Sequence, residues 1–267
     1  FYGMGRMASG IEVPFEGGEY YALKDVPHGD IRMKRYYSEV SRSWRRFFVY
    51  TPAGYDTRTD EKYPVLYLLH GGGEDERGWG TQGKTDLIMD NLIAAGKAKP
   101  MLVVMLDGNM PSAGFNAGAL KAFEAELTQA VIPFVEDNYR VRKEADSRAL
   151  AGLSMGGIQT LYAGLYHTDL FAHLGVFSSG WLPFYQKIAD DQYEFINKNK
   201  AAIDSQLRLL WIAMGGKEDI AYQNCQNMLK EFDTLKLKYT YSEYPGGHTW
   251  PVWRNNLYHF AQLLFNK

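Results

Sequence analysis

Residues 149–157 read Ala149-Leu150-Ala151-Gly152-Leu153-Ser154-Met155-Gly156-Gly157. The apolar start predicts a strand, and the glycines that follow predict a sharp turn into a helix. Within this turn, Gly152, Ser154 and Gly156 fit the pattern G-x-S-x-G, in which a serine is held on a strained strand-to-helix turn. Glycine suits the positions beside such a serine because strand and helix backbones pass closely there. An ordinary glycine turn with an incidental serine is the alternative interpretation.

The composition indicates a globular protein with a sizeable core. The chain has 267 residues, of which 46% are hydrophobic and 22% charged, enough for one large α/β domain or two small ones. The net charge of −2 implies no basic surface for nucleic acid. The longest apolar runs are too short to cross a membrane. The single cysteine, Cys225, excludes an internal disulfide and a multi-cysteine metal site.

Strand-like and helical patterns alternate through most of the chain. Continuous apolar runs at 65–69 and 101–106 predict buried strands, and the helical spacing of 87–95 between them predicts a βαβ unit. Residues 119–135 form the clearest amphipathic pattern, which Pro133 is expected to kink. Further strands are predicted at 173–177, 207–213 and 239–244, and further helices at 157–166, 221–236 and 252–265. The pattern predicts a mostly parallel, doubly wound α/β sheet.

Three segments depart from this alternation. Residues 1–29 are rich in glycine and aromatic residues, and we expect an irregular arm or linker that packs on the domain formed by 30–267. Residues 32–50 predict an antiparallel hairpin at one sheet edge. Residues 181–202 are too long for a simple loop, so we expect a short cap insertion over the carboxyl ends of the strands. The opening Phe1-Tyr2-Gly3 is not a natural start, which suggests an excised segment or mature form.

A serine nucleophile needs a base, and the base needs a group that orients it. Among the six histidines, His248 follows a turn directly after the last predicted strand, at the same sheet edge as Ser154. A carboxylate is expected between these two residues in the chain. The strand at 207–213 leads into Glu218 and Asp219, and either could serve; we favour Asp219.

A glycine run, His70-Gly71-Gly72-Gly73, follows the strand at 65–69. Glycines let backbone N–H groups approach a developing oxyanion. We expect Gly72 to supply one such N–H group, and Met155, which follows the serine, to supply the other. A flexible turn is the alternative for the glycine run taken alone.

Four stretches together resemble carbohydrate esterase family one of the α/β-hydrolase superfamily, a group that is similar to esterase D and includes feruloyl and acetylxylan esterases. They are Pro64 to Gly73, Gly152 to Gly157, Gly216 to Asp219 and Gly246 to Trp250. The resemblance implies an α/β-hydrolase fold with Ser154 as nucleophile, Asp219 as acid and His248 as base. It also implies that no metal or cofactor is required, and that the protein is secreted or periplasmic. The opening residues resemble the stretch that joins an upstream carbohydrate-binding module to such domains.

The resulting hypothesis is a serine esterase that hydrolyses feruloyl esters on plant cell-wall polysaccharide such as arabinoxylan. Because aromatic side chains stack on phenolic rings and sugars, we expect Trp79, Trp181 and Phe115 to contact the substrate. An acetylxylan or general acyl esterase would use the same residues with a smaller pocket. An acyl transferase would retain the three catalytic residues, and a non-catalytic carbohydrate-binding protein is the alternative from a different class.

Overall fold

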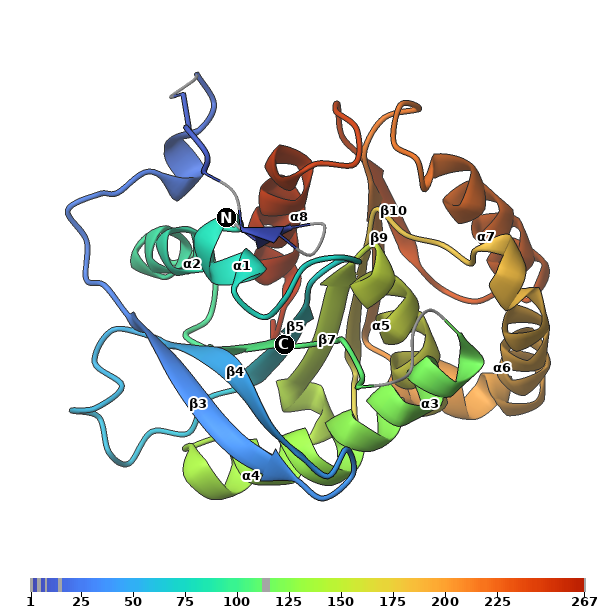
Figure 1. Cartoon of the computed structure of the whole chain (residues 1–267), viewed down its shortest axis with the longest axis horizontal. Coiled ribbons are helices and arrows are strands. Elements are labelled where there is room, and N and C mark those ends of the chain that lie inside the picture. The colour runs from blue at the N-terminus through green and yellow to red at the C-terminus, as the bar shows by residue number, and fades with distance from the viewer. Residues whose placement is uncertain (1, 4–5, 8, 14–15, 112–115, 267) are drawn as a thin grey trace.

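One sheet of eight strands organises the molecule (Figure 1). The computed structural model describes residues 2–3, 6–7, 9–13, 16–111 and 116–266, and the sheet order within them is β10-β9-β8-β7-β5-β6-β4-β3. The strands are β3 Asp30–Ser38, β4 Ser43–Thr51, β5 Val65–Leu69, β6 Leu102–Leu106, β7 Arg148–Leu153, β8 His173–Phe177, β9 Leu209–Met214 and β10 Thr240–Glu243. Strands β5 to β10 are parallel, and β3 and β4 form the antiparallel edge that was predicted. A separate pair joins β1 Tyr2–Gly3 to β2 Arg6–Met7.

Helices cover both faces of the sheet. The α-helices are α1 Gly78–Thr81, α2 Thr85–Ala94, α3 Ala117–Glu126, α4 Ile132–Asn138, α5 Met155–Tyr166, α6 Gln186–Gln206, α7 Tyr222–Thr234 and α8 Trp250–Leu263. Short 3-10 turns are η1 Glu19–Tyr21, η3 Ala145–Ser147 and η4 Pro183–Tyr185. Alternate strand residues pack against α2 and α8 on one face and against α3 to α7 on the other. Strands β5 and β6 are apolar throughout because both of their faces are buried, and β7 and β8 are apolar after their first residues, Arg148 and His173.

The helical segment in which a kink or interruption was predicted at Pro133 is divided by a π-helical turn just before this residue. Helix α3 continues into a π-helical turn, η2 Leu127–Val131, and then into α4, near whose start Pro133 lies. Proline has no N–H group to donate within a helix, and the wider turn accommodates this loss. Glu126, at the end of α3, accepts hydrogen bonds from Tyr36 at 2.8 Å and Ser38 at 2.6 Å. These two hydrogen bonds join the end of α3 to strand β3 of the edge hairpin.

The segment after β8 differs from the cap that we predicted. Residues 183–206 form η4 and α6, which together make the connection between the parallel strands β8 and β9. Helix α6 buries Ala189, Gln192, Ile196 and Ile203, a spacing that fits a helix with one buried face, and the Gln192 amide donates to the Leu161 carbonyl in α5 at 2.8 Å. Only the start of the segment, at Leu182, reaches the active-site cavity described below. The alternation of strand and helix therefore continues here.

The N-terminal segment contacts two helices. The Asn91 side chain in α2 donates hydrogen bonds to the carbonyls of Tyr20 and Ala22. Glu12 forms an ion pair with Arg254 in α8 at 2.5 Å. These contacts place the described part of residues 9–29 against α2 and α8. Among the helices in the described residues, none has both the length and the apolarity to cross a membrane.

Candidate active site

Ser154 occupies a strained turn between β7 and α5. Its φ of 52° and ψ of −114° are unusual for a residue with a side chain. A Cβ atom on Gly152 would lie 2.5 Å from the backbone of Gly156, so glycine is required where the strand and helix meet. The turn thus has the geometry of the nucleophile elbow that the sequence predicts.

Neighbouring strands fix the backbone of this turn. The Ser154 N–H donates to the Phe177 carbonyl at 2.9 Å, and the Ser179 hydroxyl donates to the Ser154 carbonyl at 2.7 Å. On the other side, the Gly156 N–H donates to the His70 carbonyl at 3.1 Å. The ends of β5 and β8 therefore hold the serine between them.

His248 and Asp219 are paired at the same sheet edge. The His248 Nδ1 atom lies 2.8 Å from the Asp219 Oδ1 atom, and the Asp219 side chain is fully buried. The same Oδ1 atom accepts the Ala221 N–H at 2.8 Å. Burial alone would raise the pKa of Asp219, but the hydrogen bonds from His248 and Ala221 hold this pKa below its ordinary value. Of the two carboxylates left open by the sequence, Glu218 instead accepts the Gly246 N–H.

Ser154 and His248 line one cavity of about 290 Å³, which we term the active-site cavity. Its walls include Gly72, Ser154, Met155, Ile158, Leu182, Ile220, Ala221, Asn224 and His248. The structure therefore brings the predicted serine and histidine to one space with both predicted oxyanion donors. Within the described ranges, no three histidine, cysteine or carboxylate side chains gather as metal ligands would.

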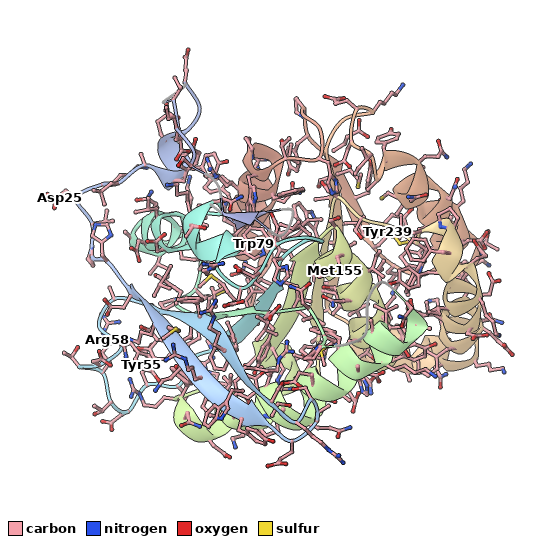
Figure 2. All side chains as sticks on the ribbon, viewed as in Figure 1. Asp25, Tyr55, Arg58, Trp79, Met155 and Tyr239 are labelled. Atoms are coloured by element: carbon pink, nitrogen blue, oxygen red, sulfur yellow. The ribbon has the colours of Figure 1, made fainter. Side chains whose placement is uncertain are left out.

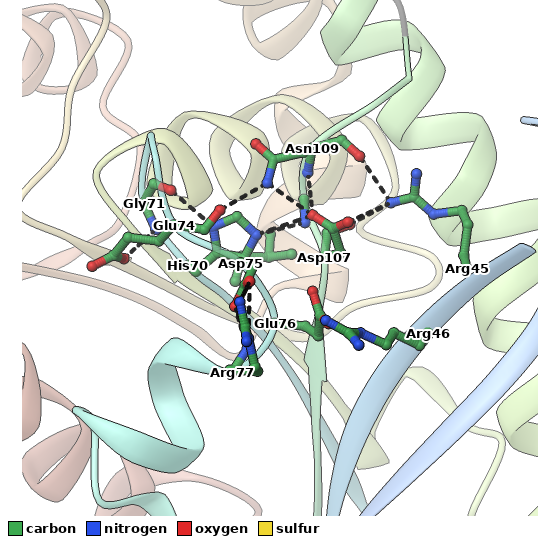
Figure 3. Close-up of polar contacts among 12 residues, drawn as sticks. Arg45, Arg46, His70, Gly71, Glu74, Asp75, Glu76, Arg77, Asp107 and Asn109 are labelled. Atoms are coloured by element: carbon green, nitrogen blue, oxygen red, sulfur yellow. Dashed lines mark hydrogen bonds and ion pairs between the residues drawn. The ribbon is translucent and has the colours of Figure 1, made fainter. Parts of the chain in front are cut away.

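His70 orients the loop that carries Gly72 (Figure 3). The Gly108 N–H donates to His70 Nε2 at 3.0 Å, so this nitrogen carries no proton and the neutral ring has its proton on Nδ1. That proton is donated to the Gly71 carbonyl at 2.8 Å. The Gly71 carbonyl and the Gly72 N–H belong to one trans peptide and point in opposite directions. By fixing the carbonyl, His70 also fixes the direction of the Gly72 N–H.

Glu74 joins the same loop to the histidine segment. Its Oε2 atom accepts the Gly71 N–H at 3.1 Å, and its Oε1 atom accepts the Trp250 Nε1–H at 2.8 Å. Burial raises the pKa of Glu74, an effect that these two hydrogen bonds oppose. Trp250 follows His248 by two residues, so Glu74 connects the loop after β5 with the loop that positions the base. No local sequence pattern indicates this role of Glu74.

The predicted contacts of Trp79 and Trp181 with substrate are not supported. Trp79 is 1% exposed, and its indole N–H donates to the Leu69 carbonyl at 2.9 Å. Figure 2 shows Trp79 on the α1 side of the molecule, apart from Met155 at the start of α5. Trp181 is 6% exposed and packs on Tyr185. Neither indole is among the described residues that line the active-site cavity, and Phe115 lies outside the described residues.

The sheet, the strained serine turn and the paired histidine and carboxylate define the class as an α/β-hydrolase. A family model described as "Putative esterase" matches residues 38–262, and the chain belongs to this family.

Known relatives include proteins much longer than this chain. The chain is 35% identical to an endo-1,4-beta-xylanase/feruloyl esterase of Xylanibacter ruminicola, over 99% of this chain and 35% of that protein. It is 27% identical to endo-1,4-beta-xylanase Y of Acetivibrio thermocellus, over 92% of this chain and 24% of the relative. The chain thus spans about a third or less of the length of these two relatives.

Solved structures share the fold over nearly the whole chain. A ferulic acid esterase from Anaeromyces mucronatus in complex with ferulic acid has a TM-score of 0.79 and 25% identity, covering 96% of this chain and 98% of that one. A mutant of the feruloyl esterase module from Clostridium thermocellum, complexed with sinapinate, also has a TM-score of 0.79 and 25% identity. That match covers 98% of this chain and 96% of the module.

Proposed function

We propose that this chain is a feruloyl esterase that hydrolyses hydroxycinnamoyl esters carried on plant cell-wall polysaccharide such as arabinoxylan. Support comes from the relatives named as feruloyl esterases and from the structural relatives that bind ferulic acid or sinapinate. The observation that carries the proposal is the active-site cavity of about 290 Å³, which lies directly beside Ser154.

The proposed reaction has two steps. His248 accepts the proton of the Ser154 hydroxyl as the serine oxygen attacks the ester carbonyl, and Asp219 stabilises the imidazolium that forms. The N–H groups of Met155 and Gly72 stabilise the tetrahedral oxyanion. His248 then donates its proton to the departing alcohol, which leaves an acyl group on Ser154. Water, activated by the same histidine, hydrolyses this acyl-enzyme.

The shape and lining of the cavity favour an aromatic acyl group over acetate. Its volume lies near the lower limit of cavities that bind small organic ligands and leaves most of the space unfilled by an acetyl group. Ile158, Leu182 and Ile220 provide apolar contacts for a planar ring. Asn224 adds an amide that can bond to a ring hydroxyl. An acetylxylan esterase, the alternative with the same catalytic residues, would leave these walls without a function.

Release of ferulate and acetate from matched substrates tests the proposal. We expect hydrolysis of methyl ferulate and of feruloylated arabinoxylan, with much slower release of acetate from acetylated xylan. Ser154→Ala should lower kcat by about 10⁴-fold or more while the protein remains folded. Acetate release alone would overturn the aromatic acyl assignment. Equal activity of Ser154→Ala and the parent would overturn the nucleophile, and sugar binding without turnover would indicate a non-catalytic binding protein.

We further propose that the chain acts outside the cytoplasm, within a longer protein that includes a carbohydrate-binding module. The xylanase names of the longer relatives support this setting, because xylan is a cell-wall polymer. Location of the native protein in culture fractions tests it. Recovery in the cytoplasm alone would contradict it.

A further inference from the structure

Two more cavities lie next to the active-site cavity. Met155 lines both the active-site cavity and a neighbouring cavity of about 190 Å³. Asn109 and Met110 line this second cavity and also a third, of about 530 Å³. The shared lining residues make the three cavities neighbours, in a row from Ser154 to the edge hairpin formed by β3 and β4. We term the third cavity the hairpin groove; its lining includes Arg35, Trp44, Arg46, Glu76, Asp107 and Asn109.

Two arginines of the hairpin groove, Arg45 and Arg46, are held by neighbouring groups (Figure 3). Arg46 forms an ion pair with Glu76. Arg45 donates to the carbonyls of Asp107 and Asn109 at 2.6 and 2.9 Å. Arg45 and Glu76 are buried, so the exposed hydrogen-bonding groups include the Arg46 guanidinium, whose charge Glu76 offsets, and the Asn109 amide. This lining suits an uncharged ligand with many hydroxyl groups, since each hydroxyl can both donate and accept.

An exposed aromatic pair, Trp44 and Tyr37, borders the hairpin groove through Trp44. Trp44 is 72% exposed, and it pairs across the hairpin with Tyr37, which is 47% exposed. Their rings meet edge to face at 5.7 Å. An indole this exposed adds little to the core, whereas its flat apolar face fits the C–H face of a sugar ring. The aromatic pair and the polar lining therefore favour the same ligand chemistry.

We propose that the hairpin groove binds the uncharged sugar chain that carries the ester, with Trp44 stacking on a sugar residue remote from the scissile bond. The inference rests on the proposed function, because the apolar active-site cavity would hold the acyl group and direct the alcohol part toward Met155 and Asn109. Sugar binding at this distance would strengthen recognition of polymeric substrates. It would leave small esters such as methyl ferulate unaffected, because they do not reach the groove.

The test compares Trp44→Ala with a matched control, Phe184→Ala. Phe184 is also an exposed aromatic residue, at 62%, but it lines a separate cavity between α5 and α6. For a feruloylated arabinoxylan oligosaccharide, we expect Trp44→Ala to lower kcat/KM about fivefold, mainly through KM. Its kcat/KM for methyl ferulate should stay within twofold of the parent, and Phe184→Ala should match the parent on both substrates.

Calorimetric titration with the unesterified oligosaccharide tests the groove independently of the acyl chemistry. We expect binding that Trp44→Ala weakens about fivefold and Phe184→Ala does not change. If the parent fails to hydrolyse methyl ferulate but this binding pattern holds, the proposed function fails and the groove assignment stands. The groove assignment is overturned if Trp44→Ala binds and hydrolyses the oligosaccharide like the parent, or if Phe184→Ala alone loses affinity.

Discussion

Replacing Asp219 by asparagine separates the charge of this residue from its role in orienting His248. The Asp219 Oδ1 atom accepts hydrogen bonds from both His248 Nδ1 and the Ala221 N–H, each at 2.8 Å. In Asp219→Asn, an amide NH₂ in place of Oδ1 would face two N–H donors, those of His248 Nδ1 and of the Ala221 backbone. The backbone N–H of Ala221 therefore selects the rotamer that keeps the amide oxygen toward His248. The orientation and the tautomer of the imidazole are retained, and only the negative charge is lost.

The size of the loss follows from the geometry of the pair. Two unit charges with centres about 4 Å apart at an effective dielectric constant of about 20 attract by about 4 kcal/mol. Each 1.36 kcal/mol of transition-state stabilisation is a factor of about ten in rate. Allowing for partial screening at the exposed side of His248, we expect Asp219→Asn to lower kcat/KM by roughly 10²- to 10³-fold. Asp219→Ala, which loses both orientation and charge, should lose about 10⁴-fold.

The assay is kcat/KM for methyl ferulate, with thermal unfolding as a check that each variant is folded. Glu218→Gln is the matched control, because the neighbouring Glu218 lies outside the His248 pair and its replacement can still accept the Gly246 N–H. We expect this control to stay within twofold of the parent. If Asp219→Asn loses as much activity as Asp219→Ala, the amide does not retain the orientation of His248. If Asp219→Asn is fully active, the charge of Asp219 contributes nothing to catalysis.

Two further predictions concern residues outside the Ser154, His248 and Asp219 set. Glu74→Gln leaves the N–H of Gly71 or Trp250 without an acceptor, a cost of about 1–3 kcal/mol. We expect a lower Tm and an approximately tenfold fall in kcat with KM nearly unchanged; a fall in Tm without loss of kcat would limit Glu74 to a structural role. Burial lowers the pKa of His173 to about 4. Between pH 6.5 and 4 the unfolded chain therefore binds more protons than the folded one, and the free energy of unfolding decreases as the pH is lowered. The free energy of unfolding, measured by urea denaturation, should decrease between pH 7 and 5 by about 2 kcal/mol less in His173→Leu than in the parent. An equal decrease in both proteins would contradict the lowered pKa of His173.

Apolar runs predicted the central strands because a strand buried on both faces must be apolar throughout. The apolar runs at 65–69 and 101–106 correspond to β5 and, within one residue, to β6. The long α6 was missed because its sequence is mostly polar and its few buried positions are widely spaced. The length of residues 181–202 suggested a cap, although only Leu182 from this stretch lines the active-site cavity.

The site was predictable where chemistry imposes a local pattern. The glycines around Ser154 reflect a close backbone approach, and the turn before His248 marks its sheet edge. By contrast, Glu74 has no local signal, because one of its partners, Trp250, lies 176 residues away in sequence. Residue type also did not reveal whether a side chain points into the cavity or into the core. Trp79 was expected in the substrate pocket, but its indole N–H points to the Leu69 carbonyl within the core.

Two groups of loops line the active-site cavity, and they have different roles. The segments that hold Ser154, Gly72 and His248 are tied together by His70 and Glu74. Leu182, Ile220 and Asn224 extend into the same space from the connections after β8 and β9. Under the proposed function, substitutions at these three positions reshape the space for the acyl group without changing the hydrogen bonds that position Ser154, Gly72 and His248. The fold therefore allows acyl preference to evolve, or to be redesigned, while the reaction chemistry is conserved.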